Sequence, residues 1–420
     1  MRLIRPLMIL VLAAQVATAE ESAPTATDSP YENVQVLARA MQLIRQDFVN
    51  EDKVSYKNLT YSAMRGMLAE LDPHSQFLDP EAFKDMQEDT KSEFGGLGVV
   101  VTMEGGLLTI VSPMEDSPGF EAGLEPGDQI LLINGESAEK LTLPLAIEKM
   151  RGEVGEKISL TIQRPSTKEI KEYNLTRAII KVPSVKDAQI LPSRPGEAKV
   201  GYVRVTQFNE PTASELAKAL DGLEKEGMEA LVLDLRHNPG GLLGSAVDVC
   251  GLFLPPNTRV VSTEGRIPGR EYRTTSRGGH QRKYPLIILV NYASASGSEV
   301  VAGALKDLNR AIIVGETTFG KGSVQGVMAL PDGSAIRFTT AKYFTPSRQV
   351  IHEKGVSPNI RVTLTPEQEI ALIRNRRDRK SANLNVPNDP QLSRAIDTLR
   401  GTLIFTQRSQ SKEPKPAKGS

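Results

Sequence analysis

The chain contains few of the residues on which many common active sites depend. Among its 420 residues there is one cysteine, which excludes an internal disulfide bond and a thiolate metal cluster. That residue, Cys250, lies in an apolar stretch, where we expect a buried thiol rather than a nucleophile. Only four histidines are present, and no two of them have the spacing of a metal-ligand pair, so we expect no metal site.

The chain also has no net charge and no long hydrophobic run. Its 51 acidic and 51 basic residues leave no electrostatic footprint for nucleic acid or an anionic membrane, and we expect no nucleic-acid partner. Apolar residues make up 39% and charged residues 24% of the chain, as in soluble globular proteins. Because 420 residues are too many for one ordinary core, we expect two or three domains.

Residues 1–19 have the pattern of a secretory signal peptide. Arg2 and Arg5 provide a positive start, residues 7–14 form a short apolar run, and Ala17-Thr-Ala19 offers small residues for cleavage. The apolar run is too short to span a bilayer comfortably. We therefore expect cleavage after Ala19 and an exported protein, which would be periplasmic in a bacterium with two membranes. An uncleaved N-terminal anchor, or peripheral membrane association, is the alternative.

Residues 20–92 are predicted to form an N-terminal helical region. Apolar residues recur three and four positions apart over 34–48, and helices are also expected over 59–71 and 83–90. Such short helices bury little apolar surface on their own. We therefore expect them to pack on another domain or on a second copy of the chain.

Residues 93–180 change to short strands separated by glycine turns. The expected strands are 98–102, 107–111, 129–133, 158–163 and 170–175, with short helices at 118–122 and 143–150. The region resembles a PDZ domain, a small barrel-like β-structure with two helices. In that family a Gly-Leu-Gly loop, here Gly96, Leu97 and Gly98, opens onto a sheet edge that accepts the C-terminus of a peptide as an added strand.

Strands and helices alternate over residues 181–365. The strands are expected at 199–206, 230–235, 286–291 and 311–315, and the helices at 213–225 and 242–252. This alternation predicts an α/β domain with a mostly parallel, buried sheet, whose catalytic groups gather at strand-to-helix loops. Residues 366–420 are expected to form a helical and flexible tail. The predicted fold class is therefore multidomain α/β.

One of these loops places a serine where a nucleophile is expected. Ser296 follows an apolar strand and begins a helix, where unpaired backbone N–H groups and the helix dipole favour negative charge. A serine attacks a carbonyl if a base removes its proton, and a lysine is such a base if burial keeps it neutral. Lys321 has no acid beside it in the sequence, and we expect neither Glu299 nor Glu316 to pair with it tightly.

With these pieces the chain resembles the carboxy-terminal processing peptidases, the PDZ-containing tail-specific serine proteases of the S41 type, over nearly its whole length. The motifs that carry the resemblance, in order, are Leu71-Asp-Pro-His-Ser-Gln-Phe-Leu, Phe94-Gly-Gly-Leu-Gly, the block 122–135, Asp234-Leu-Arg-His-Asn-Pro-Gly-Gly, Ser294-Ala-Ser-Gly-Ser-Glu and Phe319-Gly-Lys-Gly-Ser-Val-Gln. The resemblance implies a Ser296/Lys321 dyad oriented by Gln325, and acyl-enzyme chemistry without a cofactor.

The resemblance also implies how a substrate is held. It places the oxyanion hole at the N–H of Gly297 and in the loop 238–241, where we choose Gly241 because a missing Cβ allows close backbone approach. It makes Arg151 the residue that couples peptide binding to activation, with the PDZ domain holding the site closed until peptide binds. The implied substrates are envelope proteins or misfolded chains with exposed C-termini, and the expected partners are further copies of the chain and an adaptor protein.

Several alternatives stay open at this point. One is that Ser294 or Ser298, rather than Ser296, is the nucleophile. Another is that His237 completes a Ser-His-Asp triad. The segment 315–322 nearly spells a phosphate-binding P-loop, although Gly322 stands where that motif needs Ser or Thr. A further alternative is that Arg151 is an ordinary surface arginine with no role in coupling. The last is that the chain as a whole is a catalytically silent PDZ scaffold on a protease-like fold.

Overall fold

The structure, a computed structural model, describes residues 30–114, 116–139, 141–194, 196–266, 272–274, 281–377 and 389–410. The predicted signal peptide, the end of the predicted tail and His280 lie outside these residues. The chain forms two compact units that divide between Met67 and Leu68. None of the described helices combines the length and the apolar content that crossing a bilayer requires.

The first unit is helical, as the sequence predicts. Helix α1 spans Pro30–Asp47, a short 3-10 turn spans Glu51–Lys53, and α2 spans Tyr56–Ala69 and runs into the second unit. No residue of α1 is buried within the described part of the chain, although its sequence contains an apolar repeat. Val34, Leu37 and Ile44 are among the large apolar side chains that it leaves exposed.

A PDZ-like fold occupies the first half of the second unit, after strand β1 (Gln76–Leu78) and helix α3 (Pro80–Lys91). Its sheet runs in the order β3-β4-β5-β7-β8 with β6 beside β5, and all these pairs are antiparallel. The elements are β3 (Val99–Glu104), β4 (Leu107–Pro113), α4 (Pro118–Glu121), β5 (Gln129–Ile133), β6 (Glu136–Ser137), α5 (Leu143–Met150), β7 (Lys157–Arg164) and β8 (Glu169–Thr176). Strands β2 (Glu93–Gly96) and β9 (Ala178–Lys181) pair where the chain enters and leaves this fold.

The second half is built on a six-stranded sheet of order β10-β11-β12-β15-β16-β19. Strands β11 (Val200–Val205), β12 (Ala230–Asp234), β15 (Leu286–Val290), β16 (Ile312–Gly315) and β19 (Ile360–Arg361) are parallel, and only β10 (Val185–Ile190) runs against its neighbour. The predicted alternation and the mostly parallel sheet are thus confirmed. The buried sheet places the ends of β12, β15 and β16 at one edge, where their loops meet.

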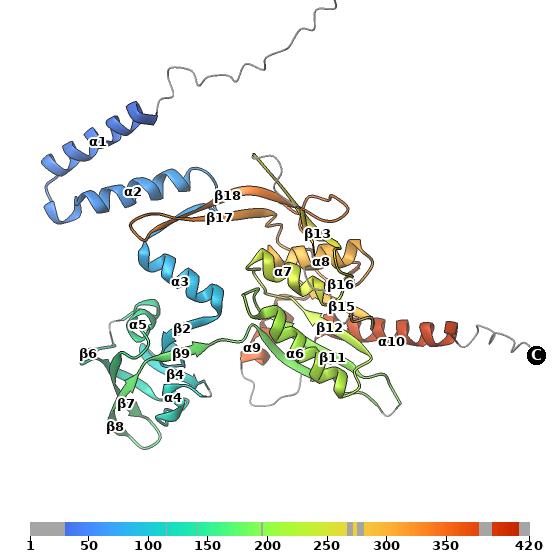
Figure 1. Ribbon diagram of the computed structural model, residues 1–420. Coiled ribbons are helices and arrows are strands. Elements are labelled where there is room, and N and C mark those ends of the chain that lie inside the picture. The colour runs from blue at the N-terminus through green and yellow to red at the C-terminus, as the bar shows by residue number, and fades with distance from the viewer. Residues whose placement is uncertain are drawn as a thin grey trace, which may run out of the picture. The chain divides into compact units, whose positions relative to one another are not determined.

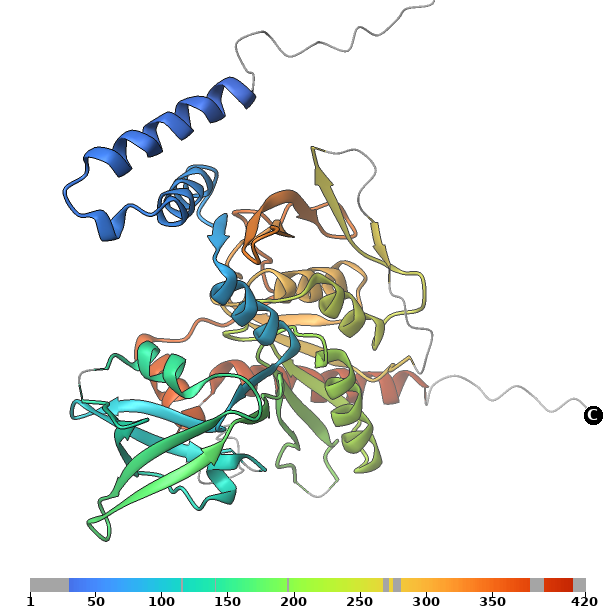
Figure 2. The ribbon, with the colours of Figure 1, turned by 60° about the vertical axis from the view of Figure 1, so that its left-hand side comes forward.

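Successive residues of a strand point to opposite sides of the sheet. Both sides of these strands are buried, and helices cover both faces. Helices α6 (Thr212–Lys225), α7 (Leu243–Gly251) and α8 (Gly297–Asp307) pack on the face that includes Val203 and Leu233. Helix α10 (Pro390–Gln410) covers the other face with Leu392, Ala395, Ile396 and Leu399 (Figures 1 and 2). The expected burial of Cys250, on α7, is confirmed, and that burial raises the pKa of its thiol.

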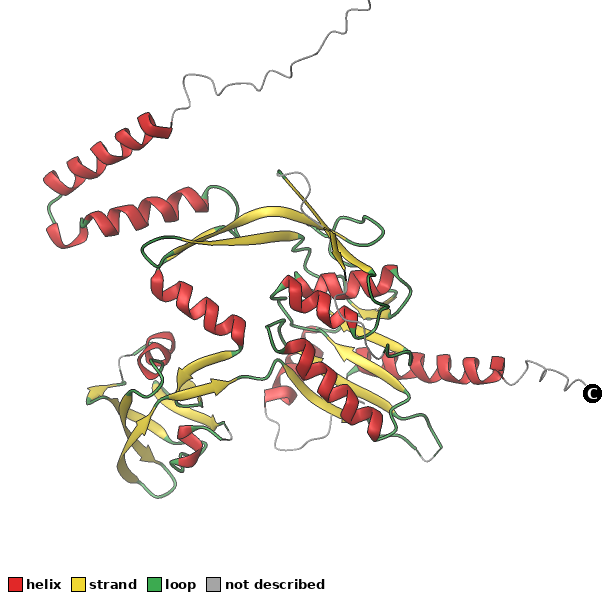
Figure 3. Ribbon diagram, in the orientation of Figure 1, coloured by secondary structure: helices red, strands yellow, loops and turns green. Residues whose placement is uncertain are grey.

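A second, antiparallel sheet was not expected from the sequence. It has the order β1-β18-β13-β14, with β17 also paired to β18. Its strands are β13 (Arg259–Gly265), β14 (Tyr272–Thr274), β17 (Ser323–Ala329) and β18 (Ala335–Phe344). Figure 3 shows β17 and β18 as two long strands that lie side by side. Helix α9 (Pro366–Arg377) follows β19. The loop that carries Lys321 joins the parallel sheet to this second sheet.

Candidate active site

The turn between β15 and α8 holds Ser296 in a backbone conformation that non-glycine residues rarely adopt. Ser296 is the N-cap of α8 and has φ 51° and ψ −111°. Such strained positions persist where the surrounding structure fixes them, and they cluster at active sites. Gly240 provides part of that fixation, since a Cβ on Gly240 would lie 2.7 Å from the Cβ of Ser296 and from the nitrogen of Gly297.

The three serines of this turn have different surroundings. The Ser294 hydroxyl donates to the carbonyl of Leu235 at 2.8 Å, and the Ser298 hydroxyl donates to the carbonyl of Asn238 at 2.9 Å. Both side chains are fully buried. Ser296 is only partly buried. The flanking serines therefore have structural bonds, and this geometry favours Ser296 as the residue that meets a substrate.

The carboxylate of Glu299 connects the serine turn to the lysine loop. Its oxygens accept the backbone N–H of Ser296 at 2.9 Å, of Lys321 at 2.8 Å and of Gly320 at 2.6 Å, together with the hydroxyl of Thr318 at 2.5 Å. One oxygen, Oε2, bonds both Ser296 and Lys321, so their backbone nitrogens lie no further apart than the sum of those two distances. Burial raises the pKa of Glu299, although these four bonds oppose the shift.

Lys321 is half-buried and has the electrostatic character of a base. Burial lowers the pKa of its amine, the charge of Arg337 lowers it further, and Glu299 only partly offsets both. Among the described residues, no ion pair joins Lys321 to Glu299 or Glu316. Glu299 bonds the backbone of Lys321 rather than its amine, as the expectation of no tight pairing requires.

Gln325 lies on β17, opposite Thr339 on β18. Its Nε2 donates to the hydroxyl of Thr339 at 2.8 Å and to that of Ser323 at 3.3 Å. Its Oε1 atom is buried and has no hydrogen-bond partner within the described part of the structure. The carboxamide thus has its donor end engaged and its acceptor end available.

The glycine loop before α7 lies directly against the serine turn. The N–H of Phe208 donates to the carbonyl of Gly240 at 2.9 Å, and the N–H of Leu242 donates to the carbonyl of Phe208 at 2.7 Å. This parallel bridge between Phe208 and Gly241 leaves the N–H of Gly241 directed away from Phe208. Gly240 is the glycine in contact with Ser296, while a Cβ on Gly241 would clash with Phe208 at 2.2 Å.

Asn238 ties this loop to both neighbouring segments. Its carbonyl accepts the N–H of Ala295 at 3.0 Å and the hydroxyl of Ser298, and its side-chain oxygen accepts the N–H of Gly240 at 2.8 Å. Its side-chain amide donates to the carbonyl of Val205 at 2.9 Å. A single buried asparagine therefore sets the separation between the glycine loop and the serine turn.

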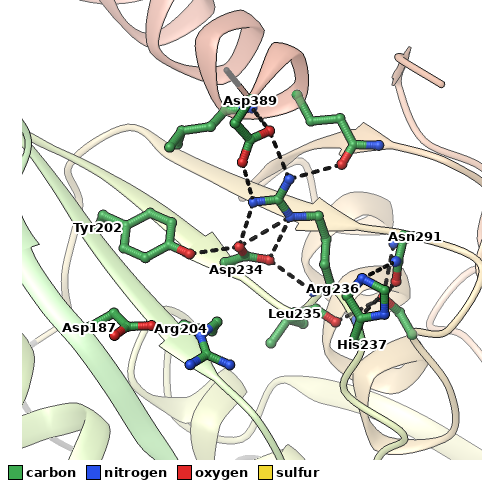
Figure 4. Close-up of polar contacts among 12 residues, drawn as sticks. Asp187, Tyr202, Arg204, Asp234, Leu235, Arg236, His237, Asn291 and Asp389 are labelled. Atoms are coloured by element: carbon green, nitrogen blue, oxygen red, sulfur yellow. Dashed lines mark hydrogen bonds and ion pairs between the residues drawn. The ribbon is translucent and has the colours of Figure 1, made fainter. Parts of the chain in front are cut away.

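A buried arginine anchors the start of the same loop. Arg236 donates to Asp234 from both Nε and Nη2, and to Asp389 at 2.9 and 2.8 Å (Figure 4). Gln391 accepts a further bond at 3.0 Å, and Tyr202 donates to Asp234 at 2.7 Å. Burial disfavours the charge of Arg236, but Asp234 and Asp389 outweigh that effect and raise its pKa.

Two of the alternatives find little support in this geometry. His237 contacts Asn291 at 3.0 Å and lies 3.7 Å from Glu369, and its ring packs edge-on to Tyr292. Those contacts place it with residues of the loop after β15 and of α9. After Lys321 the chain forms strand β17 rather than the helix that a phosphate-binding loop requires.

The four residues predicted to bind a substrate C-terminus line one groove of the PDZ-like fold. Gly96, Leu97, Gly98 and Arg151 border a space of about 220 Å³ together with apolar side chains that include Ile147 and Met150. The Arg151 guanidinium lies 4.5 Å above the ring of Phe94, and its buried Nε has no hydrogen-bond partner in the described part of the chain. The groove therefore combines apolar walls, a glycine loop and a cation.

Sequence reasoning missed several residues that build this site. The spacing Ser296-x-x-Glu299 is that of a helix capping box, and it could have identified Glu299 as the partner of the serine backbone. No comparable signal joins Glu299 to Lys321 or Arg236 to Asp389, because these pairs are distant in sequence.

Comparisons with known proteins identify two families in this chain. Residues 199–362 match peptidase family S41, and residues 109–164 match the PDZ domain. The chain is 39% identical over 372 residues to a carboxyl-terminal-processing protease of Synechocystis, covering 88% of this chain and 83% of that one. It is 38% identical over 327 residues to the carboxy-terminal processing protease CtpB of Bacillus subtilis, covering 78% and 67%.

A solved structure from Bacteroides fragilis, whose name places it among the S41 proteases, has the same fold. It aligns with a TM-score of 0.51 at 18% identity, covering 86% of this chain and 97% of that one. The predicted multidomain fold with N-terminal helices, a PDZ domain and an α/β protease domain is thus confirmed. The chain belongs to the carboxyl-terminal processing proteases of peptidase family S41, which are serine proteases acting on polypeptides.

Proposed function

We propose that this chain is an exported serine endopeptidase in which Ser296 and Lys321 form the catalytic dyad and Gln325 orients the lysine. The observation that carries the proposal is a pair of hydrogen bonds, in which Glu299 Oε2 accepts the backbone N–H groups of both Ser296 and Lys321. It fixes a strained serine and a half-buried lysine beside one another. A buried carboxylate that uses its oxygens on backbone donors does this without forming an ion pair with the amine.

In the proposed reaction Lys321 accepts the proton of the Ser296 hydroxyl as Oγ attacks the carbonyl carbon of the scissile peptide bond. The N–H groups of Gly297 and Gly241 stabilise the negative oxygen of the tetrahedral intermediate. Lys321 then gives its proton to the leaving amine, and the C–N bond breaks to leave an acyl-enzyme. A water molecule, deprotonated by the same amine, hydrolyses the ester and restores both residues.

The PDZ groove is proposed to select substrates by their C-termini. The free carboxylate would meet the N–H groups of the loop 96–98, and apolar final residues would fill the space beside Ile147 and Met150. Arg151, whose buried Nε finds no hydrogen-bond partner among the described residues, borders the same groove and is proposed to report its occupancy. Exposed C-termini of envelope proteins, or of misfolded chains, fit this mode of recognition.

The cellular setting is also proposed from the sequence. Residues 1–19 would act as a cleaved signal peptide and direct the protein to the periplasm. The exposed apolar side chains of α1 are proposed to contact a further copy of the chain, and an adaptor protein is proposed as a second partner. Mass measurement of the mature N-terminus and of the assembly in solution tests these points.

The dyad is tested by cleavage of an unfolded polypeptide with an apolar C-terminus. Ser296→Ala and Lys321→Ala should each reduce kcat about a thousandfold or more, with an unchanged circular dichroism spectrum. Lys321→Arg should be equally inactive, since a guanidinium does not become neutral. Ser298→Ala, the matched neighbour, should retain measurable cleavage.

Activity retained by Ser296→Ala would refute the assignment of the nucleophile. If the wild-type protein cleaves no such polypeptide even with a partner protein added, the scaffold alternative gains instead.

A further inference from the structure

We propose that the turn formed by residues 72–75 is a positioning device of the active site, which acts through Thr339 to fix the orientation of the Gln325 carboxamide. The inference rests on the proposed roles of Lys321 and Gln325. It assigns a task to the Leu71-Asp-Pro-His-Ser motif, which lies before the PDZ fold in sequence and has no part in the chemistry described above.

The turn reaches Gln325 through contacts of β1 and β18. Strand β1 follows the turn directly and pairs antiparallel with β18, with Gln76 opposite Arg337. Beside this pair the N–H of Thr339 donates to the Ser75 hydroxyl at 3.4 Å, and Ser75 donates to Asp72 at 2.9 Å. Thr339 in turn accepts the Nε2 bond of Gln325 at 2.8 Å.

The turn also lies within electrostatic reach of the proposed base. Burial lowers the pKa of His74, and the next largest cause is the charge of Lys321. The backbone N–H of His74 donates to Asp72 at 2.8 Å, which holds the turn closed. Residues 72–75 thus contact the strand that faces Gln325 and lie within electrostatic reach of Lys321.

The ionised carboxylate of Asp72 sets the direction of the hydroxyl hydrogen bonds in this series. A carboxylate only accepts hydrogen bonds, so the Thr339 hydroxyl that bonds Asp72 must donate its proton there. The Thr339 oxygen is then left with lone pairs and accepts from Gln325, which fixes Nε2 toward Thr339. Burial favours the neutral form of Asp72, but bonds from His74, Thr339 and Ser75 outweigh it and lower the pKa, so the acid is ionised at neutral pH.

The orientation of the carboxamide decides what the lysine can do. With Nε2 held by Thr339, Gln325 presents its buried Oε1, which has no hydrogen-bond partner among the described residues. In the working enzyme this oxygen would accept one N–H of the neutral Lys321 amine and leave the nitrogen lone pair for Ser296. In the flipped orientation Nε2 would donate into that lone pair and compete with the Ser296 proton. A wrongly oriented glutamine would therefore remove the base without removing any catalytic residue.

The matched pair Thr339→Val and Thr339→Ser tests the inference, because the first removes the hydroxyl at nearly constant shape and the second keeps it. In the full-length protein, Thr339→Val should reduce kcat by about tenfold to a hundredfold with KM unchanged. Thr339→Ser should remain close to wild type. Asp72→Asn should behave like Thr339→Val, since an amide can donate to Thr339 and release its hydroxyl toward Gln325.

The pH profile of kcat separates positioning from a loss of packing. A flipped carboxamide donates to the neutral amine and stabilises it, so the acid limb of Thr339→Val should move to lower pH. Packing loss that admits water would move this limb to higher pH. The charged groups that act on Lys321 are Arg337 and Glu299, with His74 close by, and all three are unchanged in these variants.

Wild-type kcat and pH profile in Thr339→Val, or an acid limb at higher pH, would overturn the inference. Should that variant fail to fold by circular dichroism, Asp72→Asn decides by the same two measurements. Ser296→Ala is run beside them. If it is inactive while Thr339→Val is normal, only this inference fails, whereas an active Ser296→Ala removes the proposed function itself.

Discussion

Several neighbouring groups act on the pKa of the Lys321 amine. Burial and the charge of Arg337 lower its pKa, while Glu299 opposes them with an oxygen that already bonds two backbone N–H groups. Because the proposed base must be neutral, activity should be present above the pKa of Lys321 and be lost as the pH falls through it.

Removing the charge of Arg337 should therefore shift the activity of the enzyme along the pH axis. Arg337→Gln raises the pKa of Lys321, so the acid limb of kcat/KM against pH should move to higher pH, with the plateau at high pH little changed. Arg337→Lys, which keeps a positive charge at the same strand position, should leave the limb near that of wild type. An acid limb that is identical in both variants would show that the charge of Arg337 does not reach the base.

Individual residues of the site differ in how far the sequence predicts them. The strand-turn-helix pattern and the family motifs point to Ser296, and the structure supports that choice because Ser294 and Ser298 have buried structural bonds. Thr339 carries no sequence signal, since an isolated threonine in a strand looks like any other. Its position matters only after β17 and β18 pair.

Among the elements, the C-terminal helix α10 contributes more than a tail would. Asp389 caps its first turn by accepting the N–H of Leu392 at 3.0 Å, and the same carboxylate receives Arg236. Arg236 lies two residues before Asn238, which holds the glycine loop against the serine turn. The docking of α10 and the geometry of that loop therefore share one buried ion pair.

Asp389→Asn should weaken this connection, because it replaces one of the two charged partners of the buried Arg236 with a neutral amide. We expect a loss of about 1.5–3 kcal/mol in the free energy of unfolding, the range for hydrogen bonds to charged groups. Urea unfolding followed by circular dichroism measures it, and Asp397→Asn, an exposed acid on the same helix, is the matched control. Equal stabilities of the two variants would contradict a structural role for the pair.

Elements were predictable where their pattern is local. The parallel sheet and its helices follow from alternating apolar runs, and the PDZ strands follow from glycine turns at short spacing. The antiparallel sheet is different, because β1, β13 and β18 come from three distant parts of the chain. Their pairing depends on tertiary contacts that no window of the sequence contains.

At the scale of the whole second unit, a series of contacts leads from the base of the PDZ fold to the serine turn. Just before β2, the Ser92 hydroxyl accepts the side-chain amide of Asn209 at 2.5 Å, and the carbonyl of Thr90 accepts the N–H of Glu210. The adjacent Phe208 bonds the glycine loop on both sides of Gly241. If occupancy of the groove controls the site, as proposed, this series of hydrogen bonds and adjacent residues is a route by which it can do so.

Asn209→Ala should uncouple the groove from the chemistry. The reporter is a small activated ester, which is too short to reach the groove. Adding a separate peptide with apolar C-terminal residues and a free carboxylate should change the rate at which the wild-type enzyme hydrolyses this ester. The control is the same peptide with an amidated C-terminus, which lacks the carboxylate. In Asn209→Ala the rate without peptide should persist, while the rate change caused by the carboxylate peptide should fall toward the change caused by the control. If the variant binds the peptide with wild-type affinity and still responds fully, control does not pass through Asn209, and the contacts around Ser92 only join the two folds mechanically.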